Sequence, residues 1–521
     1  MSKIVSRFPW LMPLLGGLLM ALGPAPLNVW IVPWVAIVPL WLVVLEGRSP
    51  VKSGILWGFV YHGISLFWIT GLHPLTSVGI SGFNSVAIVA VVWAFITFFG
   101  ASCVGVWAGA LAWMAKRRIH PVVRVLGAAG LWCAIEQLRS YSALDWTAIA
   151  YTQSPGNLAI LHLGQISGNA LIAAAIVAVN GAIAEAWWSN RNRSESRLEF
   201  PKLTALIPAV LPAIAIFTVA HLIGWGISLS AVPSQSPPIR IGTVQGNHSI
   251  RGNPWAASGR QDLWNYLDGY ETLVAQGAQM VLFPEGSLPL EWVNYPDRLM
   301  AQKIKNLQIP VALGASGMRG NRRTQAMFML NENGNIASQY DKVKVVPLGE
   351  SLPFEEILSK FVSELSPPRD YLIAGQPDQI FKTPFGQAGV GICYESAFPE
   401  IFRRQVEQGA TFLISASNLD PFSTVLMAQQ EAHDIMRAIE TDRPMIRVTN
   451  TGYSGLIEST GQTKWRSQPN RYDLHISELS PRMTQTLYVR YGNWITPWLL
   501  GLSIVLSVSL SLSPIGLTRP R

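Results

Sequence analysis

The sequence predicts a bundle of about eight transmembrane α-helices joined to an exported α/β domain of layered sheets. The 521 residues are 49% hydrophobic and only 13% charged, and they include 20 tryptophans, a profile typical of a membrane protein with a sizeable soluble part. Apolar stretches of membrane-spanning length recur in residues 1–230, whereas strand-like and helix-like runs alternate in residues 231–491. Residues 492–521 are expected to form a last transmembrane helix and a cytoplasmic tail.

Eight apolar stretches approach or exceed the ~20 residues that a helix needs to cross a bilayer. The stretch 121–138 fits least well, because Arg124 and Glu136 interrupt it. The first stretch also has the pattern of a cleaved signal peptide, but an uncut first helix is needed for the positive charges to alternate between connections. The eight stretches cover roughly residues 8–25, 28–46, 53–71, 85–115, 121–138, 160–188, 203–230 and 493–513.

Lysines and arginines gather in every second connection, while the connections near residues 24–28 and 72–84 contain none. Because basic residues favour the cytoplasmic side, this alternation predicts that both termini are cytoplasmic and that residues 231–491 are exported. The formal net charge of +8 is then largely a topology signal, so we expect no nucleic-acid partner. The basic residues concerned are Lys3, Arg7, Arg48, Lys52, Lys116, Arg117, Arg118, Arg191, Arg193, Arg197, Lys202, Arg519 and Arg521.

The exported domain begins after the proline- and serine-rich run 233–238. The turn-forming run 331–335 between two strand-like runs predicts a β-hairpin. Alternating strands and helices predict sheets that are covered by helices. Strands are predicted at 239–244, 280–283, 311–315, 326–330, 336–338, 387–391, 412–415 and 445–448, and helices at 261–278, 299–307, 398–406 and 426–441.

Cys393 stands where the predicted strand 387–391 ends, shortly before the predicted helix 398–406. A thiol near a helix N-terminus loses its proton more easily, so the position is typical of a nucleophile. The alternative is a buried structural cysteine. Cys103 and Cys133 fall in apolar membrane stretches, so no disulfide framework is expected.

Two further groups stand at strand ends, where α/β domains place their reactive groups. Glu285 follows an apolar strand and suits a general base, although a turn or capping glutamate has the same pattern. Lys342 and Lys344 lie in a strand-like run, where one lysine can point inward to stabilise an oxyanion or both can be solvated edge residues. The sequence has no metal-ligand spacing, phosphate-cradling glycine loop or dinucleotide motif, so no metal and no cofactor are expected.

The order of Glu285, Lys342 and Cys393, in the contexts Pro-Glu, Asp-Lys and Cys-Tyr-Glu, resembles the carbon–nitrogen hydrolase (nitrilase) superfamily. With the helical bundle and the final helix, the chain resembles the membrane-embedded apolipoprotein N-acyltransferase family over nearly its whole length. This resemblance implies a nitrilase-like αββα sandwich. Further matching stretches are 57–59, 136–139, 244–247, 345–353, 436–440, 449–452 and 492–494.

The resemblance implies that Cys393 is the nucleophile, Glu285 the general base and Lys342 the oxyanion stabiliser. It also implies a fatty acyl transfer from a membrane phospholipid to the N-terminal amine of a diacylated apolipoprotein, through a thioester. The enzyme would be a monomer in the bacterial inner membrane, with its catalytic domain on the periplasmic side. Supporting roles are implied for Glu350, Tyr394, Glu395 and Trp255.

Two other functions remain open at this stage. A membrane-tethered amidase would use the same three residues with water as the acceptor. A catalytically inactive scaffold or transporter-like protein would not need the intact set of Glu285, Lys342 and Cys393, and an ion-coupled transporter would carry more charges inside its membrane segments.

Three local features lead to further expectations. The loop 418–423 departs from the Asn-Asp-Ala-Trp-Phe-Gly stretch of the family, with Pro421 in place of the tryptophan, so substrate preference is expected to differ. The run 351–361 has the apolar spacing of a mobile lid at the lipid surface, or of an ordinary core-facing helix. Glu136 and Arg139 are expected to pair near a membrane surface, with a lipid-headgroup contact as the alternative.

Overall fold

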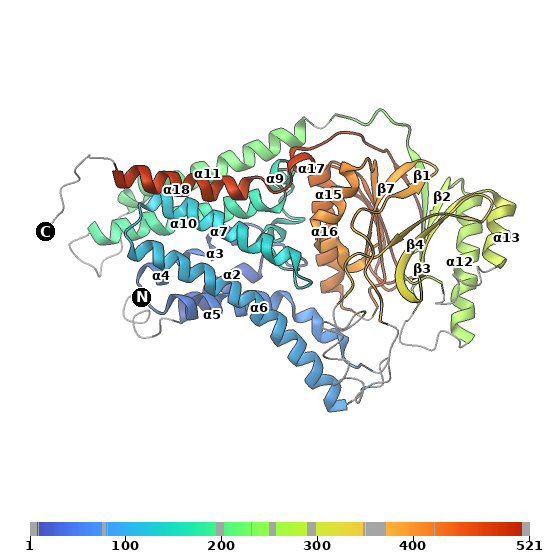
Figure 1. The fold of residues 1–521 in the computed structure, drawn as a ribbon, viewed down its shortest axis with the longest axis horizontal. Helices are drawn as coiled ribbons and strands as arrows, with labels where there is room; N and C mark the ends of the chain where they lie inside the picture. The colour runs from blue at the N-terminus through green and yellow to red at the C-terminus, as the bar shows by residue number, and fades with distance from the viewer. Residues whose placement is uncertain are drawn as a thin grey trace.

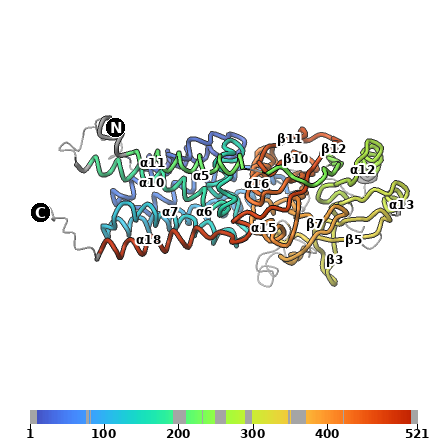
Figure 2. Tube along the Cα trace, turned by 90° about the horizontal axis from the view of Figure 1, so that it is seen from above, coloured from blue at the N-terminus to red at the C-terminus, as the bar shows by residue number. Residues whose placement is uncertain are grey.

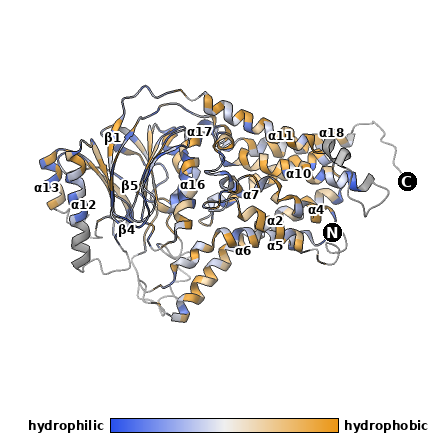
Figure 3. Cartoon of the chain, turned by 180° about the vertical axis from the view of Figure 1, so that it is seen from behind, coloured by the Kyte–Doolittle hydropathy of each residue, from blue (hydrophilic) through white to orange (hydrophobic). Residues whose placement is uncertain are grey.

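The chain folds into a bundle of apolar helices beside a domain built on two sheets (Figure 1). The computed structural model describes residues 8, 10–75, 80, 82–193, 203–230, 232–248, 257–288, 298–346, 350, 371–420 and 422–512. Figure 3 shows that hydrophobic residues predominate along the helices of the bundle, whereas hydrophilic and hydrophobic residues are mixed in the other domain.

Within the described part of the chain, four helices are long and apolar enough to cross a membrane: α6 (Gly82–Lys116), α7 (Pro121–Tyr141), and most of α10 (Asn169–Arg193) and α11 (Leu203–Leu229). The stretch 121–138 is therefore a full-length helix. The shorter helices of the bundle are α2 (Leu11–Ala21), α3 (Pro33–Ala36), α4 (Val38–Leu45), α5 (Pro50–Ser65), α8 (Leu158–Leu161), α9 (Gly164–Ser167), α18 (Ile495–Leu512), and the 3₁₀ helices η1 (Phe67–Leu72) and η3 (Ile149–Gln153).

Each of the eight predicted stretches contains a helix, but two boundaries were wrong. The stretch 28–46 is divided at Ile37 into α3 and α4, and each of these helices starts with a proline in its first turn. The stretch 160–188 begins as α10 only at Asn169, because Gly168 adopts φ +63° and ends α9.

The two-sheet domain, residues 232–491, contains two six-stranded sheets that each have three parallel strands at the centre. We name them the outer sheet, with strand order β12-β1-β2-β3-β4-β5, and the inner sheet, with strand order β11-β10-β9-β8-β7-β6. The predicted hairpin is confirmed as β4–β5. The strands are β1 (Ile239–Gln245), β2 (Met280–Leu282), β3 (Val311–Arg319), β4 (Arg322–Leu330), β5 (Ile336–Asp341), β6 (Phe381–Thr383), β7 (Gly386–Ile392), β8 (Phe412–Ser417), β9 (Met445–Thr449), β10 (Gly455–Ile457), β11 (Thr463–Arg466) and β12 (Asp473–Leu479).

The two sheets face each other across a shared core and carry helices on their far faces, which confirms the αββα sandwich. α12 (Ala257–Ala275) and α13 (Arg298–Leu307) cover the outer sheet, on the side away from the bundle. α15 (Pro399–Glu407) and α16 (Thr424–Thr441) cover the inner sheet, on the side of the bundle (Figures 1 and 2). The short α17 (Leu487–Tyr491) leads from this domain into α18.

α16 lies between the bundle and the inner sheet, and almost all of its residues are buried. The hydrophobic core of the bundle continues through α15 and α16 to the inner sheet, where it includes Leu413. Polar contacts reinforce this joint: Trp146 Nε1 donates to Gln429 Oε1 at 2.8 Å, and Ser154 Oγ donates to the Ala432 carbonyl at 2.7 Å. The inner sheet is therefore fixed to the bundle.

Candidate active site

The structure brings Glu285, Lys342 and Cys393 together at one end of the two sheets. Glu285 comes shortly after β2, and Lys342 directly follows β5, both in the outer sheet. Cys393 directly follows β7 of the inner sheet. The predicted placement of these residues at strand ends is confirmed, and the two sheets share the site.

Lys342 is the cation of the site, and its side chain is fully buried. Its Nζ donates to Glu285 Oε1 at 3.1 Å and to Glu350 Oε1 at 2.6 Å. Glu285 also accepts, on Oε2, a hydrogen bond of 2.9 Å from the Asn418 backbone N–H. The two carboxylates compensate the buried charge of the ammonium. When all three groups are ionised, the cluster carries one negative charge in excess.

The backbone around Glu285 passes very close to β3. A Cβ atom at Gly314 would collide with the backbone of Pro284 and Glu285, so only glycine fits at this position of β3. Ser287 Oγ donates to the Gly314 carbonyl at 3.0 Å and fixes the turn after Glu285. This contact sets the position of the Glu285 carboxylate relative to Lys342.

Cys393 has an unusual backbone conformation, with φ +53°. A non-glycine residue in this left-handed region costs about 1–3 kcal/mol, which the surrounding contacts must offset. Gln430 of α16 provides one such contact, because its Nε2 donates to the Cys393 carbonyl at 2.7 Å. The thiol sulfur lies 3.9 Å from the Asn418 carbonyl oxygen.

Burial and neighbouring charges shift the pKa values of all three groups. Burial raises the pKa of the Cys393 thiol well above its usual value, and the charge of Glu285 adds to this effect. Burial also raises the pKa of Glu285, against the opposing effect of the Lys342 ammonium. Burial alone would lower the pKa of Lys342, but Glu285 and Glu350 raise it well above its usual range.

The expectation that a helix N-terminus lowers the pKa of Cys393 was therefore wrong. Cys393 begins only a 3₁₀ helix, η4 (Cys393–Ala397), and the loss of solvent outweighs the weak field of so short a helix. The resting thiol stays protonated near neutral pH, so its activation requires a base close by.

Glu395 lies beneath the site and connects the two sheets. Its Oε1 accepts from the backbone N–H groups of Val343 (2.6 Å) and Lys344 (3.0 Å), next to Lys342 in the chain. Its Oε2 accepts from Ile392 N–H (2.7 Å) and from the Tyr340 hydroxyl (3.1 Å). This one carboxylate fixes the segment that bears Lys342 against the turn that bears Cys393.

Tyr394 faces the bundle. Its ring lies parallel to that of Trp146, with the centroids 5.8 Å apart, and its hydroxyl donates to the Ala143 carbonyl. Lys344 Nζ also reaches the bundle and donates to the Tyr141 carbonyl at 3.1 Å. The bundle loop 142–148 thus lies against Tyr394, the residue that follows the candidate nucleophile in the chain.

Two polar groups that were not predicted as site residues also hold this site, Gln430 and Asn450. Asn450 Nδ2 donates to Asn418 Oδ1 at 3.0 Å, which steadies the residue that contacts both Glu285 and Cys393. Asn418 and Asn450 follow the strands β8 and β9, so their position at strand ends was a usable signal. Gln430 acts from the middle of a helix and gave no such signal.

Some expectations lie outside the described residues. These are the entrance role of Trp255, the lid run 351–361 and the position of Pro421. The expected pairing of Glu136 with Arg139 was wrong: Arg139 Nε donates to Asp145 Oδ1 at 2.9 Å, while Glu136 Oε1 accepts from Trp132 Nε1 and from the Ile149 backbone N–H.

Comparisons with known proteins cover both halves of the chain. Residues 240–470 match the family model "Carbon-nitrogen hydrolase", and residues 16–182 match "Apolipoprotein N-acyltransferase N-terminal domain". The "Apolipoprotein N-acyltransferase" of Nostoc sp. is 43% identical over 496 residues, covering 93% of this chain and 96% of that protein. The protein of the same name from Synechocystis sp. is 36% identical and covers 93% of this chain and 98% of that protein. An amidase structure from Nesterenkonia sp. is 19% identical, with a TM-score of 0.39, covering 52% of this chain and 99% of that one.

Proposed function

The chain belongs to the apolipoprotein N-acyltransferase family, and from this membership and the geometry of its site we propose that it transfers a fatty acyl chain from a membrane phospholipid to the N-terminal amine of a diacylated apolipoprotein. The main support from the structure is the cluster of Glu285, Lys342 and Glu350, which lies close enough to Cys393 for its charges to act on the thiol, beside the joint with an apolar bundle. Both substrates are membrane-anchored, so a site at this joint is where they can meet.

The reaction has two steps through one covalent intermediate. Glu285 takes the proton of the Cys393 thiol as sulfur attacks the ester carbonyl of the phospholipid. The Lys342 ammonium stabilises the oxyanion of the tetrahedral intermediate. The intermediate then collapses, the lysophospholipid alkoxide leaves with the proton held by Glu285, and an acyl-thioester remains on Cys393.

The second step restores the enzyme. The α-amine of the apolipoprotein attacks the thioester carbonyl, and Lys342 again stabilises the oxyanion. Glu285 takes a proton from the amine and returns it to the departing Cys393 thiolate, so the amide product leaves and the thiol is regenerated. Glu350 keeps the ammonium of Lys342 in place while Glu285 changes its protonation state.

The proposal includes the orientation of the chain in the membrane and its oligomeric state. The alternation of basic residues supports cytoplasmic termini and an exported two-sheet domain in the bacterial inner membrane. Glu285, Lys342 and Cys393 come from one chain, which supports action as a monomer. A membrane-impermeant maleimide applied to intact cells should label a cysteine introduced at Glu332 on the two-sheet domain, and protection until the cells are lysed would contradict this orientation.

The central experiment follows the acyl chain. Purified protein is incubated with a phospholipid labelled in its acyl chain, and mass spectrometry is used to find the adduct on Cys393. A diacylated lipopeptide is then added. Transfer of the label to the peptide amine supports the proposal, release only to water would support the membrane-tethered amidase, and absence of any adduct on Cys393 would contradict its role as nucleophile.

A further inference from the structure

A chain of buried polar groups lies behind Cys393, between α16 and the inner sheet, and takes no part in the proton transfers described above. It begins at Gln430 of α16, whose Nε2 donates to the Cys393 carbonyl at 2.7 Å and to Ser417 Oγ at 2.8 Å. About one turn further along the helix, Asp434 Oδ2 accepts from Ser415 Oγ at 2.8 Å. Both helical side chains therefore point to the inner sheet, at strand β8.

The two contacts along β8 have the spacing of a helix that lies along a strand. Four helical residues rise ~6 Å and two strand residues rise ~6.6 Å, so Gln430 and Asp434 meet side chains two residues apart. A shift of α16 by one residue would turn both side chains away from Ser417 and Ser415. The two pairs therefore fix α16 along the inner sheet, and with it the position of Gln430 at the Cys393 carbonyl.

Arg447 of β9 completes the chain of contacts. Its Cα lies opposite that of Ser415 in the sheet, so both side chains point to the same face, towards α16. Arg447 Nη1 donates to Asp434 Oδ2 and, at 3.4 Å, to the Gln430 carbonyl. Its Nε donates to the Tyr453 carbonyl at 3.1 Å, so one guanidinium binds both α16 and the segment after β9. We name Gln430, Asp434 and Arg447 the α16–β9 cluster.

Stability alone is a weak explanation of the α16–β9 cluster. The side chains of Arg447 and Asp434 are 1% and 0% exposed, and a buried ion pair is often no more stable than apolar side chains of the same size. Burial lowers the pKa of Arg447 to about 10, so its guanidinium remains charged near neutral pH. Three buried atoms, Gln430 Oε1, Asp434 Oδ1 and Arg447 Nη2, make no hydrogen bond within the described residues, and each of them costs free energy.

The cluster ends at the carbonyl oxygen of a strained residue. Cys393 has φ +53°, so its backbone would relax if the surrounding contacts were lost. Relaxation would re-aim the thiol relative to Glu285 and Lys342. A displacement of ~1 Å at a reacting atom can lower a rate by ~10², so the hydrogen bond from Gln430 has a direct consequence for acylation.

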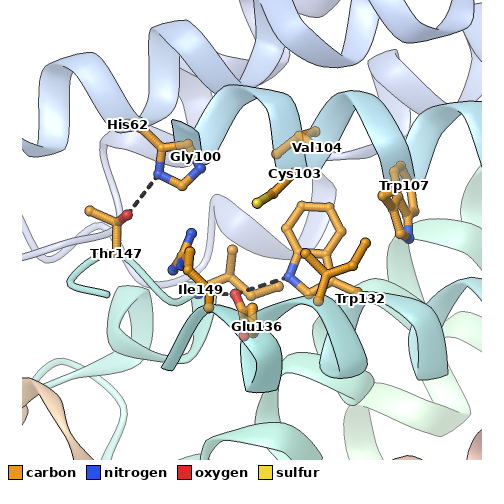
Figure 4. Close-up of a pocket in the computed structure, with 11 residues that line it drawn as sticks. His62, Gly100, Cys103, Val104, Trp107, Trp132, Glu136, Thr147 and Ile149 are labelled. Atoms are coloured by element: carbon orange, nitrogen blue, oxygen red, sulfur yellow. Dashed lines mark hydrogen bonds between the residues drawn. The ribbon is translucent and has the colours of Figure 1, made fainter. Parts of the chain in front are cut away.

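Buried polar groups of the bundle offer a contrast. A cavity of about 20 Å³ between α6 and α7 has room for about one water molecule (Figure 4). In its walls, His62 Nδ1 lies 2.7 Å from Thr147 Oγ1, and Trp132 Nε1 donates at 3.0 Å to Glu136 Oε1; dashed lines mark both contacts in Figure 4. These pairs stay within the bundle, whereas the α16–β9 cluster ends on the backbone of the candidate nucleophile.

We propose that Arg447 and Asp434 are positioning residues for the Cys393 thiol, which act through Gln430 by fixing α16 against the inner sheet. They hold the backbone that carries the thiol and not the thiol itself. The role in acyl transfer rests on the proposed function, whereas the effect on the backbone at Cys393 does not.

The contact with Cys393 is tested with two variants of one hydrogen-bonding pair. Gln430→Met keeps the length of the side chain but removes its donor, so the maximal rate of Cys393 acylation by phospholipid should fall by about 10–100-fold. The half-saturating phospholipid concentration should stay unchanged, because Gln430 positions the thiol without binding lipid. Ser417→Ala removes the other acceptor of the same amide and should leave the rate within threefold.

The remote ion pair is tested by Arg447→Lys. The ammonium keeps the charge beside Asp434 but cannot reproduce the contacts of both Nε and Nη1, so the maximal rate should fall about tenfold. Arg124→Lys is the matched control, because it makes the same change in a buried ion pair of the bundle, with Glu185. It should lower the unfolding midpoint and leave acylation within threefold. Asp434→Asn is a second variant of the positioning pair and should repeat the effect of Arg447→Lys.

Hydrogen exchange tests the positioning without substrate. Amide exchange in the peptide that contains η4, followed by mass spectrometry of the full-length protein, should be about tenfold faster in Gln430→Met and Arg447→Lys and unchanged in Ser417→Ala and Arg124→Lys. Unchanged exchange in the first two variants, or faster exchange with wild-type acylation, would overturn the proposal. If the wild-type protein forms no adduct on Cys393, the proposed function fails, while the exchange result still decides whether the α16–β9 cluster holds this backbone.

Discussion

The two sheets contribute to one site, but they differ in what surrounds them. The outer sheet supplies Glu285 and Lys342, and its far face is covered by α12 and α13, away from the bundle. The inner sheet supplies Cys393, and its far face is joined to the bundle through α16. The proposed nucleophile therefore belongs to the layer that is fixed to the bundle, and Glu285 and Lys342 belong to the other layer.

This difference implies a separation of effects. Substitutions of the outer-sheet charges should impair the chemistry while the joint with the bundle stays intact. Substitutions at the joint should lower stability more than they lower the chemical rate. Glu395 contacts both layers, so its loss should affect both properties.

Glu285→Gln is expected to have the largest effect. A positioned general base typically contributes ~10²–10⁴ in rate, so acylation of Cys393 should slow by about that factor. The midpoint of thermal unfolding should change little, because Lys342 keeps its ion pair with Glu350. Acylation within threefold of the wild-type rate would show that another group removes the thiol proton.

Lys342→Met should slow acylation by ~10²–10³, the usual cost of an oxyanion donor. Lys344→Met is the matched control two residues away. Lys344 donates to the Tyr141 carbonyl and lies over the ring of Phe398, so it contributes to the joint, and its loss should slow acylation less than about fivefold. Similar losses in the two variants would contradict an oxyanion role that is specific to Lys342.

The contrast between these lysines also shows how far the sequence could predict the site. The strand ends carrying Glu285 and Cys393 were predictable from apolar runs, and so were the hairpin and most central strands. The pattern could not decide which lysine points inward, because that depends on two carboxylates, one of them from the strand end after β2. The left-handed backbone of Cys393 also depends on a distant contact, the amide of Gln430 on α16.

The bundle shows the same limit. Hydrophobicity predicted the helices of the bundle, but the predicted ion-pair partner of Arg139 was wrong. Spacing along a helix suggested Glu136, whereas the chain turns after α7 and brings Asp145 back to the guanidinium. The path of such a loop depends on its backbone geometry, which the spacing of hydrophobic residues does not predict.

Glu395→Gln tests the connection between the sheets. The amide keeps one of the two acceptor oxygens, so about two of the four donors around Glu395 lose their partner, at ~1–3 kcal/mol each. We expect a lower unfolding midpoint together with at least tenfold slower acylation. Normal acylation in a destabilised protein would mean that Glu395 supports the fold without positioning the site.

The pH dependence provides an independent check on Glu395. Burial raises the pKa of Glu395 to about 7, so the folded protein binds this proton more tightly than the unfolded chain does. Its stabilising contribution is complete below ~pH 4.3 and is lost as the pH rises to about 7. The unfolding midpoint of wild type should therefore fall across this range more steeply than that of Glu395→Gln, and parallel curves would contradict the raised pKa.

Alkylation of Cys393 tests whether the resting thiol is protonated. An ordinary thiol with a pKa of ~8.5 reaches its maximal rate with iodoacetamide near pH 9.5. Because burial raises the pKa of Cys393 well above its usual value, its rate should still be rising with pH at that point. Cys103→Ala with Cys133→Ala restricts the reaction to Cys393, and a plateau between pH 8 and 9 would show an ordinary thiol.

Tyr151→Phe is expected to have the smallest effect, and it tests the joint alone. The Tyr151 hydroxyl accepts from Arg437 Nη1 at 3.1 Å and from Asn169 Nδ2 at 3.0 Å, and it donates to the Ala397 carbonyl at 3.3 Å. Arg437 keeps its ion pair with Glu440, so no buried charge is left uncompensated, and the loss should be about 1–2 kcal/mol. The unfolding midpoint should fall by a few degrees, while acylation of Cys393 changes less than threefold. A larger loss of rate than of stability would mean that the joint positions the thiol, and the division of roles between the two sheets would not hold.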